Sequence, residues 1–197
     1  MPFFSLKEFQ PKRRFRFLVS FSNLLGIKYL VKSVNKPSYT MAHKEHNVLN
    51  HVFKFPGVIK WNDVKVTFID AIEPDTGSKF MNVLRNSGYV FPSANPGSLT
   101  TGITKAGSVT SLGQVIIQQL DGGSMAISAD PGDLAGAQGD TRIAEEWILK
   151  NAFIKGVQFG EGLDYSSEEI VEVSLDLVYD YATINEITAK GSVLKLE

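Results

Sequence analysis

The sequence predicts a mainly β fold: a small antiparallel β-barrel or two packed sheets with one flanking α-helix. Apolar and polar residues alternate with a period of two along most of the chain. The connections between the alternating runs are hairpin-like, and only one segment has helical spacing. Because 197 residues can bury one proper core, we expect a single domain over residues 1–197.

The first strand is predicted in residues 13–22. It places four apolar side chains on one face: Phe15, Phe17, Val19 and Phe21. A second run, residues 27–35, follows a turn near residues 23–26 and is predicted to pair with the first strand as a hairpin. A further strand in residues 62–70 turns Val64, Val66 and Phe68 inward.

The helix is predicted in residues 73–89. Asp75 or Thr76 can cap its N-terminus, and Gly88 can end it. The predicted apolar stripe consists of Phe80, Met81 and Leu84.

The remaining strands lie in the second half of the chain. Residues 113–120 form one, and residues 145–160 hold two runs separated by a break near Asn151. The longest alternation covers residues 166–184. Its predicted inward face is Val171, Val173, Leu175, Leu177 and Tyr179.

The expected core covers about residues 13–184, with three long loops at about 36–60, 92–110 and 121–141 and a peripheral tail at 185–197. Loops of this length are uncommon in a compact domain unless they have a function.

The composition of the sequence argues against several classes of function. The formal net charge of −1 gives no basic field for tight nucleic-acid binding. The sequence has no cysteine, which excludes disulfides and thiolate metal sites. We find no signal-peptide pattern and no apolar run near the roughly 18 residues of a membrane helix. A soluble protein of the cytoplasm is expected, without a membrane partner.

A search for chemistry finds no catalytic, cofactor or metal site. His43, Glu45 and His46 could be metal ligands, but solvated loop histidines are the better account. Asp130, Asp133 and Asp140 lack the ligand spacing of an EF-hand loop.

Two charged clusters also have simpler explanations. The first, Glu161, Asp164, Glu168 and Glu169, lies among Ser and Gly, where nothing suggests burial. The second is the basic cluster Lys12, Arg13, Arg14 and Arg16. Local basic clusters of this kind are more often solvated or paired with acidic groups than part of a nucleic-acid site. We therefore do not expect an enzyme.

The segment from Tyr39 to Trp61 has no clean period and is too apolar to be left in water. Exposed apolar patches mark partner surfaces, and aromatic residues and Met are enriched in interface cores. We predict that this segment contacts other copies of the chain; the alternative is that it folds back on its own sheet.

The second half of the chain resembles the tail tube proteins of contractile-tailed bacteriophages, a family related to the inner tubes of contractile injection systems. In that family a strand with Trp ends in an Asn-Ala-aromatic step, a turn of the form V.FG.LDY.S.E follows, and a long strand ends in Tyr-Asp. Every piece is present in order in residues 147–182. The matching motif positions are Asn151, Ala152, Phe153, Leu163, Asp164, Tyr165, Tyr179 and Asp180.

The first half is similar to the family as well. A Phe-rich strand and a short strand ending in KSVNKP precede a long loop, then FPGVIKWNDVKVTFID and the helix, so the resemblance covers about residues 13–184. It departs from the family pattern at Pro92–Ser108 and Gly122–Asp140, which leaves the phage group open.

The resemblance implies a structural virion protein without enzymatic activity or cofactor. Six copies would close into a ring, and rings would stack into the tail tube that conducts DNA at ejection. Implied partners are the sheath protein outside, the tape-measure protein and DNA inside, and baseplate and terminator proteins at the ends. The implied location is the virion, after assembly in the host cytoplasm. The implied ring-stacking loop includes Tyr39, Met41, His46, Phe53, Phe55, Pro56 and Trp61.

Cationic side chains in the bore would hold DNA, so we expect a neutral to acidic lumen. Alternation makes Glu172, Ser174 and Asp176 candidates for it. Two alternatives remain open. One is the inner tube of a pyocin-like or type VI injection system, and the more distant one is a monomeric ligand-binding β-barrel.

Overall fold

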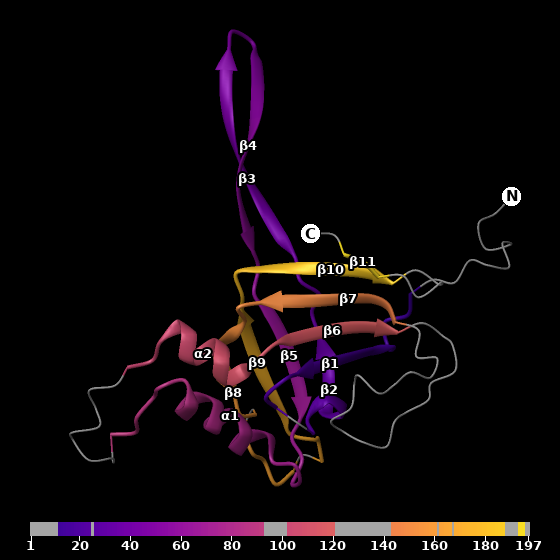
Figure 1. The fold of residues 1–197 in the computed structure, drawn as a ribbon, viewed down its shortest axis with the longest axis vertical. Helices are drawn as coiled ribbons and strands as arrows, with labels where there is room; N and C mark the ends of the chain where they lie inside the picture. The colour runs from indigo at the N-terminus through magenta and orange to yellow at the C-terminus, as the bar shows by residue number, and fades with distance from the viewer. Residues whose placement is uncertain are drawn as a thin grey trace, which may run out of the picture.

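The computed structural model describes residues 12–24, 26–92, 102–120, 143–160, 162–166, 168–187 and 193–195. The described residues form two antiparallel sheets, two α-helices and a long two-stranded arm that projects away from the body (Figure 1). The mainly β fold class is therefore confirmed. Within the described residues the strands remain in three separate sheets, so the packed-sheet form of the prediction holds and the closed barrel does not.

Sheet A has five strands, and every pairing in it is antiparallel. Their spatial order is β1 (Phe17–Phe21), β6 (Val115–Leu120), β7 (Ile143–Lys150), β10 (Tyr181–Ile187) and β11 (Val193–Lys195). Sheet B has four strands, again antiparallel. Their order is β2 (Val31–Val34), β5 (Val64–Ile69), β9 (Glu172–Val178) and β8 (Phe153–Gln158).

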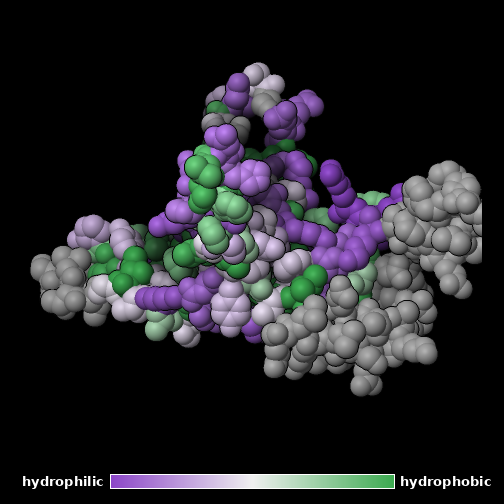
Figure 2. Space-filling model, turned by 90° about the horizontal axis from the view of Figure 1, so that it is seen from above, coloured by the Kyte–Doolittle hydropathy of each residue, from purple (hydrophilic) through white to green (hydrophobic). Residues whose placement is uncertain are grey.

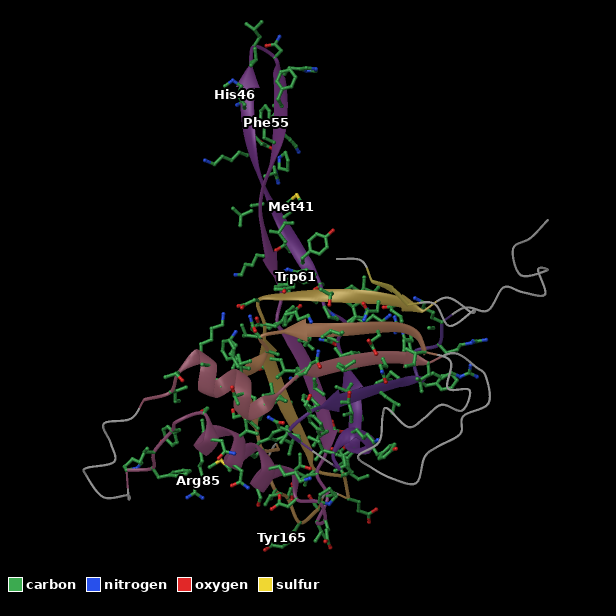
Figure 3. The ribbon with its side chains drawn as sticks, viewed as in Figure 1. Met41, His46, Phe55, Trp61, Arg85 and Tyr165 are labelled. Carbon is green, nitrogen blue, oxygen red and sulfur yellow. The ribbon has the colours of Figure 1, made fainter. Side chains whose placement is uncertain are left out.

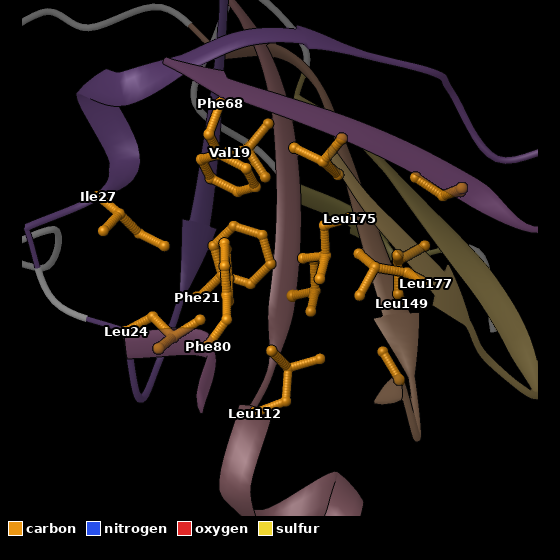
Figure 4. Packing of buried hydrophobic residues seen from close by; sticks show 14 of the residues in the cluster. Val19, Phe21, Leu24, Ile27, Phe68, Phe80, Leu112, Leu149, Leu175 and Leu177 are labelled. Carbon is orange, nitrogen blue, oxygen red and sulfur yellow. The ribbon is translucent and has the colours of Figure 1, made fainter. Parts of the chain in front are cut away.

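The core lies between the two sheets and is filled by alternate residues of their strands (Figure 4). The predicted inward face of β5 is confirmed, since Val64, Val66 and Phe68 are completely buried. The fully buried residues Val173, Leu175 and Leu177 lie opposite them on β9. The predicted inward position Val171 was wrong, because this residue precedes β9 and is 37% exposed. On β1, Val19 and Phe21 are buried as predicted, whereas Phe15 precedes the strand and is 74% exposed.

Two helices close one end of the core. Helix α1 (Thr76–Asn86) starts at the N-cap Asp75, whose carboxylate accepts a 3.1 Å hydrogen bond from the Ser78 amide. Its buried residues include Phe80, which meets Phe68 edge-on at 5.3 Å, and Val83. The predicted apolar stripe was thus wrong at Leu84, which is 37% exposed. The preceding residue, Val83, is the one that the helix turns into the core.

The prediction of one helix was also wrong, since α2 (Lys105–Leu112) begins inside the expected loop 92–110 and runs past its end. Its Gly, Ser and Thr content gives a weak amphipathic pattern, and the buried Leu112 anchors it. The 3₁₀ turn η2 (Lys28–Leu30) precedes β2. Neither α-helix in the described part of the chain has the length and apolar run needed to cross a membrane.

The predicted hairpin of the first two strands does not form. Strand β1 pairs with β6 of sheet A, and β2 pairs with β5 of sheet B. The connection between them packs the side chains of Leu24 and Ile27 into the core and leads from one sheet to the other, so no hairpin forms here.

Two further loop assignments need correction. The expected loop 36–60 is a β-hairpin, described below, and the tail 185–197 contributes to β10 and β11 at the edge of sheet A. The expected loop 121–141 lies outside the described residues.

The chain changes sheet at two adjacent corners. Asn151, in the break predicted between two strands, has φ of 55° and leads from β7 in sheet A to β8 in sheet B. Asp180 leads from β9 back to β10 in sheet A. The Asn151 amide donates a 2.7 Å hydrogen bond to Asp180, which also accepts two 2.7 Å bonds from Lys105 at the start of α2. These bonds lower the pKa of Asp180.

Substitution of Asn151 separates two contributions to the stability of this corner: the hydrogen bond to Asp180 and the left-handed backbone of residue 151. In N151G the hydrogen bond to Asp180 is lost but a left-handed backbone remains easy to adopt, so we expect a loss of about 1 kcal/mol. N151A loses the same bond and adds about 1 kcal/mol of left-handed strain. Urea unfolding measures both, and equal stabilities of the two variants would contradict the assignment of strain to this residue.

Candidate functional site

The most exposed element is a hairpin of β3 (Tyr39–Val48) and β4 (His51–Trp61), which we call the arm. Every residue of the arm except Trp61 is exposed to solvent. A ten-residue strand spans about 34 Å, and Figure 1 shows that the arm extends along the long axis of the molecule. The alternative that this segment folds back on its own sheet is thereby excluded.

The exposed surface of the arm is strongly apolar. Phe53 and Phe55 are 48% and 56% exposed, and Leu49 at the tip is 99% exposed. Viewed from above, where the arm points toward the viewer, hydrophobic and hydrophilic side chains are mixed together (Figure 2). The full set of exposed large apolar residues is Tyr39, Met41, Val48, Leu49, Val52, Phe53, Phe55, Val58 and Ile59. Apolar surface concentrated on a projecting element indicates a site for another protein chain.

Cross-strand register determines which side chains share a face of the arm. His46 lies opposite Phe53, and Lys44 lies opposite Phe55, so aromatic and basic groups share one face. The predicted contact residue Pro56 pairs with His43, next to a register shift between Met41 and His43. The arm therefore presents an aromatic, basic surface.

The same register argues against a metal site on the arm. His43 Nε2 lies 3.6 Å from a carboxylate oxygen of Glu45, two residues along the strand. His46 belongs to the opposite face, since side chains alternate along a strand. Across the described residues, no group of three His, Asp or Glu side chains is arranged to hold a metal ion.

The base of the arm is tied to the body by aromatic packing. Trp61 contacts Tyr39 with ring centroids 5.5 Å apart and Tyr179 at 5.9 Å. The backbone amide of Asn62 donates a 2.9 Å hydrogen bond to the backbone carbonyl of Ser38, which closes the hairpin. Trp61, which was predicted as a ring-stacking residue, lies at the base of the arm (Figure 3) and contacts Tyr179 of the body.

A buried carboxylate provides a second anchor. Glu145 on β7 is 5% exposed and accepts hydrogen bonds from Lys12, from Lys36 at 2.8 Å, and from the indole of Trp147. Lys36 lies three residues before the arm, so this cluster connects sheet A to the arm's base. Burial alone would raise the pKa of Glu145, but the three donors lower it to about 2.

The lumen candidates lie on the outward face of sheet B. Ser174 and Asp176 alternate with the buried residues of β9, and Glu172 begins the same strand. Lysines on this face have acidic neighbours: Lys32 pairs with Glu172, and Lys155 Nζ lies 2.6 Å from Asp63 Oδ2. Lys65 is registered opposite Asp176. The face is therefore close to neutral.

The motif positions divide into two groups. Asn151, Ala152, Tyr179 and Asp180 meet at the sheet corners, where Ala152 is 1% and Tyr179 6% exposed. Phe153 pairs with Val178 at the start of β8.

The other motif positions lie in the loop between β8 and β9, at the end of the molecule away from the arm. Leu163 is 89% exposed, and Tyr165 is fully exposed (Figure 3). Asp164 accepts bonds from the Ser166 amide at 3.0 Å and from its hydroxyl at 2.9 Å, which lower the pKa of Asp164. The loop borders a groove of about 830 Å³ on the outward face of sheet B.

Solved structures with similar folds come from contractile particles. One chain in the cryo-EM structure of the anti-feeding prophage baseplate, 6-fold symmetrised, superposes with a TM-score of 0.56 at 15% identity, covering 91% of this chain and 99% of that chain. Chains from the sheath/tube terminator and the sheath-tube complex of an extracellular contractile injection system, PVC, have the same TM-score. Their identities are 17% and 14%, they cover 90% and 95% of this chain, and 98% and 99% of their own length is matched.

This chain shares its fold with these chains of contractile particles. No known family description and no curated protein matches the sequence. The predicted resemblance is thus confirmed at the level of fold, through structural neighbours from contractile injection particles. In this fold, the two sheet corners are the features that short sequence motifs mark. The hairpin geometry of the arm was not predicted from the sequence.

The buried Glu145 predicts a specific pH dependence of stability. Because its pKa falls from an ordinary value of 4.5 to about 2, the ionised side chain stabilises the fold fully above pH 4.5. That contribution, at most about 3 kcal/mol, is lost as the pH falls from about 4.5 to about 2. We expect E145Q to lower the free energy of unfolding at neutral pH, with the difference from wild type shrinking over this range.

The matched control is E172Q, which removes the carboxylate of a more exposed Lys–Glu pair. Exposed pairs contribute about 0 to 1 kcal/mol, so this variant should remain close to wild type. Urea unfolding at a series of pH values measures both variants. A difference between E145Q and wild type that stays constant from neutral pH to pH about 2 would refute the prediction.

Proposed function

We propose that this chain is the structural subunit of the inner tube of a contractile tail. Residues 1–197 act as one subunit domain, six copies close into a ring, and rings stack into a hollow tube. The observation that carries the proposal is the arm, an exposed, apolar hairpin on a body with the contractile-tail tube fold. Such a surface is stabilised by docking onto another copy.

Ring closure is supported by the open edges of sheet B. Strands β2 and β8 are the outer strands of this sheet, and in the described residues neither has a second neighbour. Unpaired edges promote association with other strands. In the proposed ring, sheet B of one copy continues into sheet B of the next. A six-membered ring agrees with the 6-fold symmetrised baseplate of the anti-feeding prophage, which contains one of the structural neighbours.

This closure would turn the outward face of sheet B toward the bore, with Glu172, Ser174 and Asp176 lining it. Lysines on that face lie beside carboxylates, as with Lys32 and Glu172. DNA is held by cationic side chains through release of its counterions, so a neutral face lets it pass. The proposed role is a conduit for DNA ejection and for the tape-measure protein, inside a sheath and between baseplate and terminator, in a virion assembled in the host cytoplasm.

A second candidate is the inner tube of a contractile injection system. It is favoured by the particles to which the structural neighbours belong, the anti-feeding prophage and PVC. Particles purified with this chain would distinguish the two, since a phage particle carries a DNA-filled head and an injection particle does not.

Negative-stain microscopy of the concentrated, purified chain tests assembly. We expect rings and hollow tubes from the wild-type chain. A variant in which residues 43–56 are replaced by an Asn-Gly turn keeps a hairpin base but loses most of the apolar arm. We expect rings from this variant but no long tubes, whereas a wild-type chain that stays monomeric at every concentration would contradict the proposed assembly.

A cryo-EM map of the tube tests the lining of the bore. We expect Glu172, Ser174 and Asp176 to face the lumen with sheet B continuous around it. A bore lined by unpaired Lys and Arg side chains would overturn this part of the proposal.

A further inference from the structure

A groove runs between the two α-helices and the turn that follows β1. Its volume is about 910 Å³, and its walls come from α1, from α2 and from residues 22–24. Figure 1 shows both helices together on one flank of the body, away from the tip of the arm. None of the lining residues belongs to the arm or to sheet B, so this groove is separate from the surfaces of the proposed tube described above.

The walls of the groove are held together by close contacts. The Asn23 side-chain amide donates a 2.6 Å hydrogen bond to the Thr110 carbonyl, which ties the turn to α2. A Cβ atom added at Gly107 would lie 2.9 Å from the Ser87 carbonyl oxygen, so α2 approaches the end of α1 more closely than a larger residue allows. The groove is therefore formed before any ligand binds, as is usual for binding sites.

Two asparagines of α1 give the groove a pattern of hydrogen-bonding groups. Asn82 and Asn86 are exposed, and within the described residues their side-chain amides have no hydrogen-bond partner. Each carboxamide offers a donor and an acceptor, which is the pair that a peptide group also presents. Four residues of a helix rise about 6 Å, and two residues of an extended chain span about 6.6 Å. The spacing of the two amides thus matches an extended peptide that lies along α1.

The charge of the helical region favours an acidic ligand. Residues 76–120 contain both helices and three basic residues but no Asp or Glu, although the whole chain has 21 acidic residues. Lys79 lines the groove and lies on the same face of α1 as Asn82 and Asn86. No carboxylate is present among the described residues that line the groove. A surface of this kind is complementary to negative charge.

A nucleic acid is also negatively charged, but it fits the groove less well than a peptide does. Tight binding of a phosphate backbone takes several Lys or Arg side chains. Among the described lining residues, Lys79 is the single Lys or Arg. The amides of Asn82 and Asn86 supply neutral hydrogen bonds, which suit peptide groups.

We infer that the groove between α1 and α2 binds an extended, acidic segment of a partner protein. Asn82 and Asn86 bond to the backbone of this segment, and Lys79 pairs with one of its carboxylates. The inference goes beyond the proposed tube, since it assigns a partner surface that uses neither the arm nor sheet B. Because the ion pair lies in an open groove, binding weakens as added salt shortens the Debye length, which is about 10 Å at 0.1 M.

Fluorescence anisotropy with a labelled synthetic peptide tests the inference in any assembly state of the chain. The probe is a ten-residue peptide in which Ala and Asp alternate, and we expect saturable binding at low salt. N82A/N86A should weaken binding by about tenfold or more, because two hydrogen bonds are lost. K79Q should weaken it by about threefold and remove most of the salt dependence. Ala has a higher helix propensity than Asn, so N82A/N86A should remain folded, and circular dichroism verifies this.

Matched controls change the same residue types outside the groove. N35A/N47A removes two exposed asparagines of other elements. R85Q removes a cation of α1 whose guanidinium lies 5.7 Å from the ring centroid of Phe91 and does not line the groove. Both control variants should bind the acidic peptide like the wild type. A peptide with Lys in place of Asp should not bind.

Four outcomes would each overturn the inference. They are a dissociation constant for the acidic peptide above about 1 mM at low salt, unchanged binding in N82A/N86A, an equal loss in N35A/N47A, and tighter binding of a ten-nucleotide thymidine strand than of the peptide. These measurements do not depend on rings or tubes, so they leave the test of the proposed function to microscopy of the arm variant.

Discussion

The packing of sheet A against sheet B holds every functional surface of this chain in place. Val64, Val66 and Phe68 of β5 are completely buried between the sheets, and the strand follows directly after the arm. The exposed loop between β8 and β9 leads into β9, whose Val173, Leu175 and Leu177 are buried against the same core. Both exposed ends are therefore extensions of strands that are fixed at the centre of the molecule.

This arrangement explains how an arm with no core of its own keeps a defined direction. A two-stranded hairpin is marginally stable in water when isolated. Here its base is held by Trp61 between Tyr39 and Tyr179, and the preceding Lys36 is bonded to the buried Glu145. The body orients the arm, and the exposed aromatic side chains remain available for a partner.

Sequence reasoning predicted the buried strands well, because one face of each meets the core and period-two alternation follows directly from that contact. Strands β5 and β9 are the clearest cases. The arm was predicted as a loop for the opposite physical reason: neither of its faces is buried, so no alternation marks it. Two irregularities obscure the pattern further. One is the register shift next to Met41, and the other is Pro56 within β4.

Pairing between strands was harder to predict than the strands themselves. A turn that buries Leu24 and Ile27 moves the chain from one sheet to the other, and short-range patterns favour a hairpin there. In the candidate site, the apolar content of the arm was visible in the sequence, and the structure shows that these side chains are exposed. The anchoring role of Trp61 and the buried Glu145 depend on contacts between distant segments, which a single sequence does not reveal.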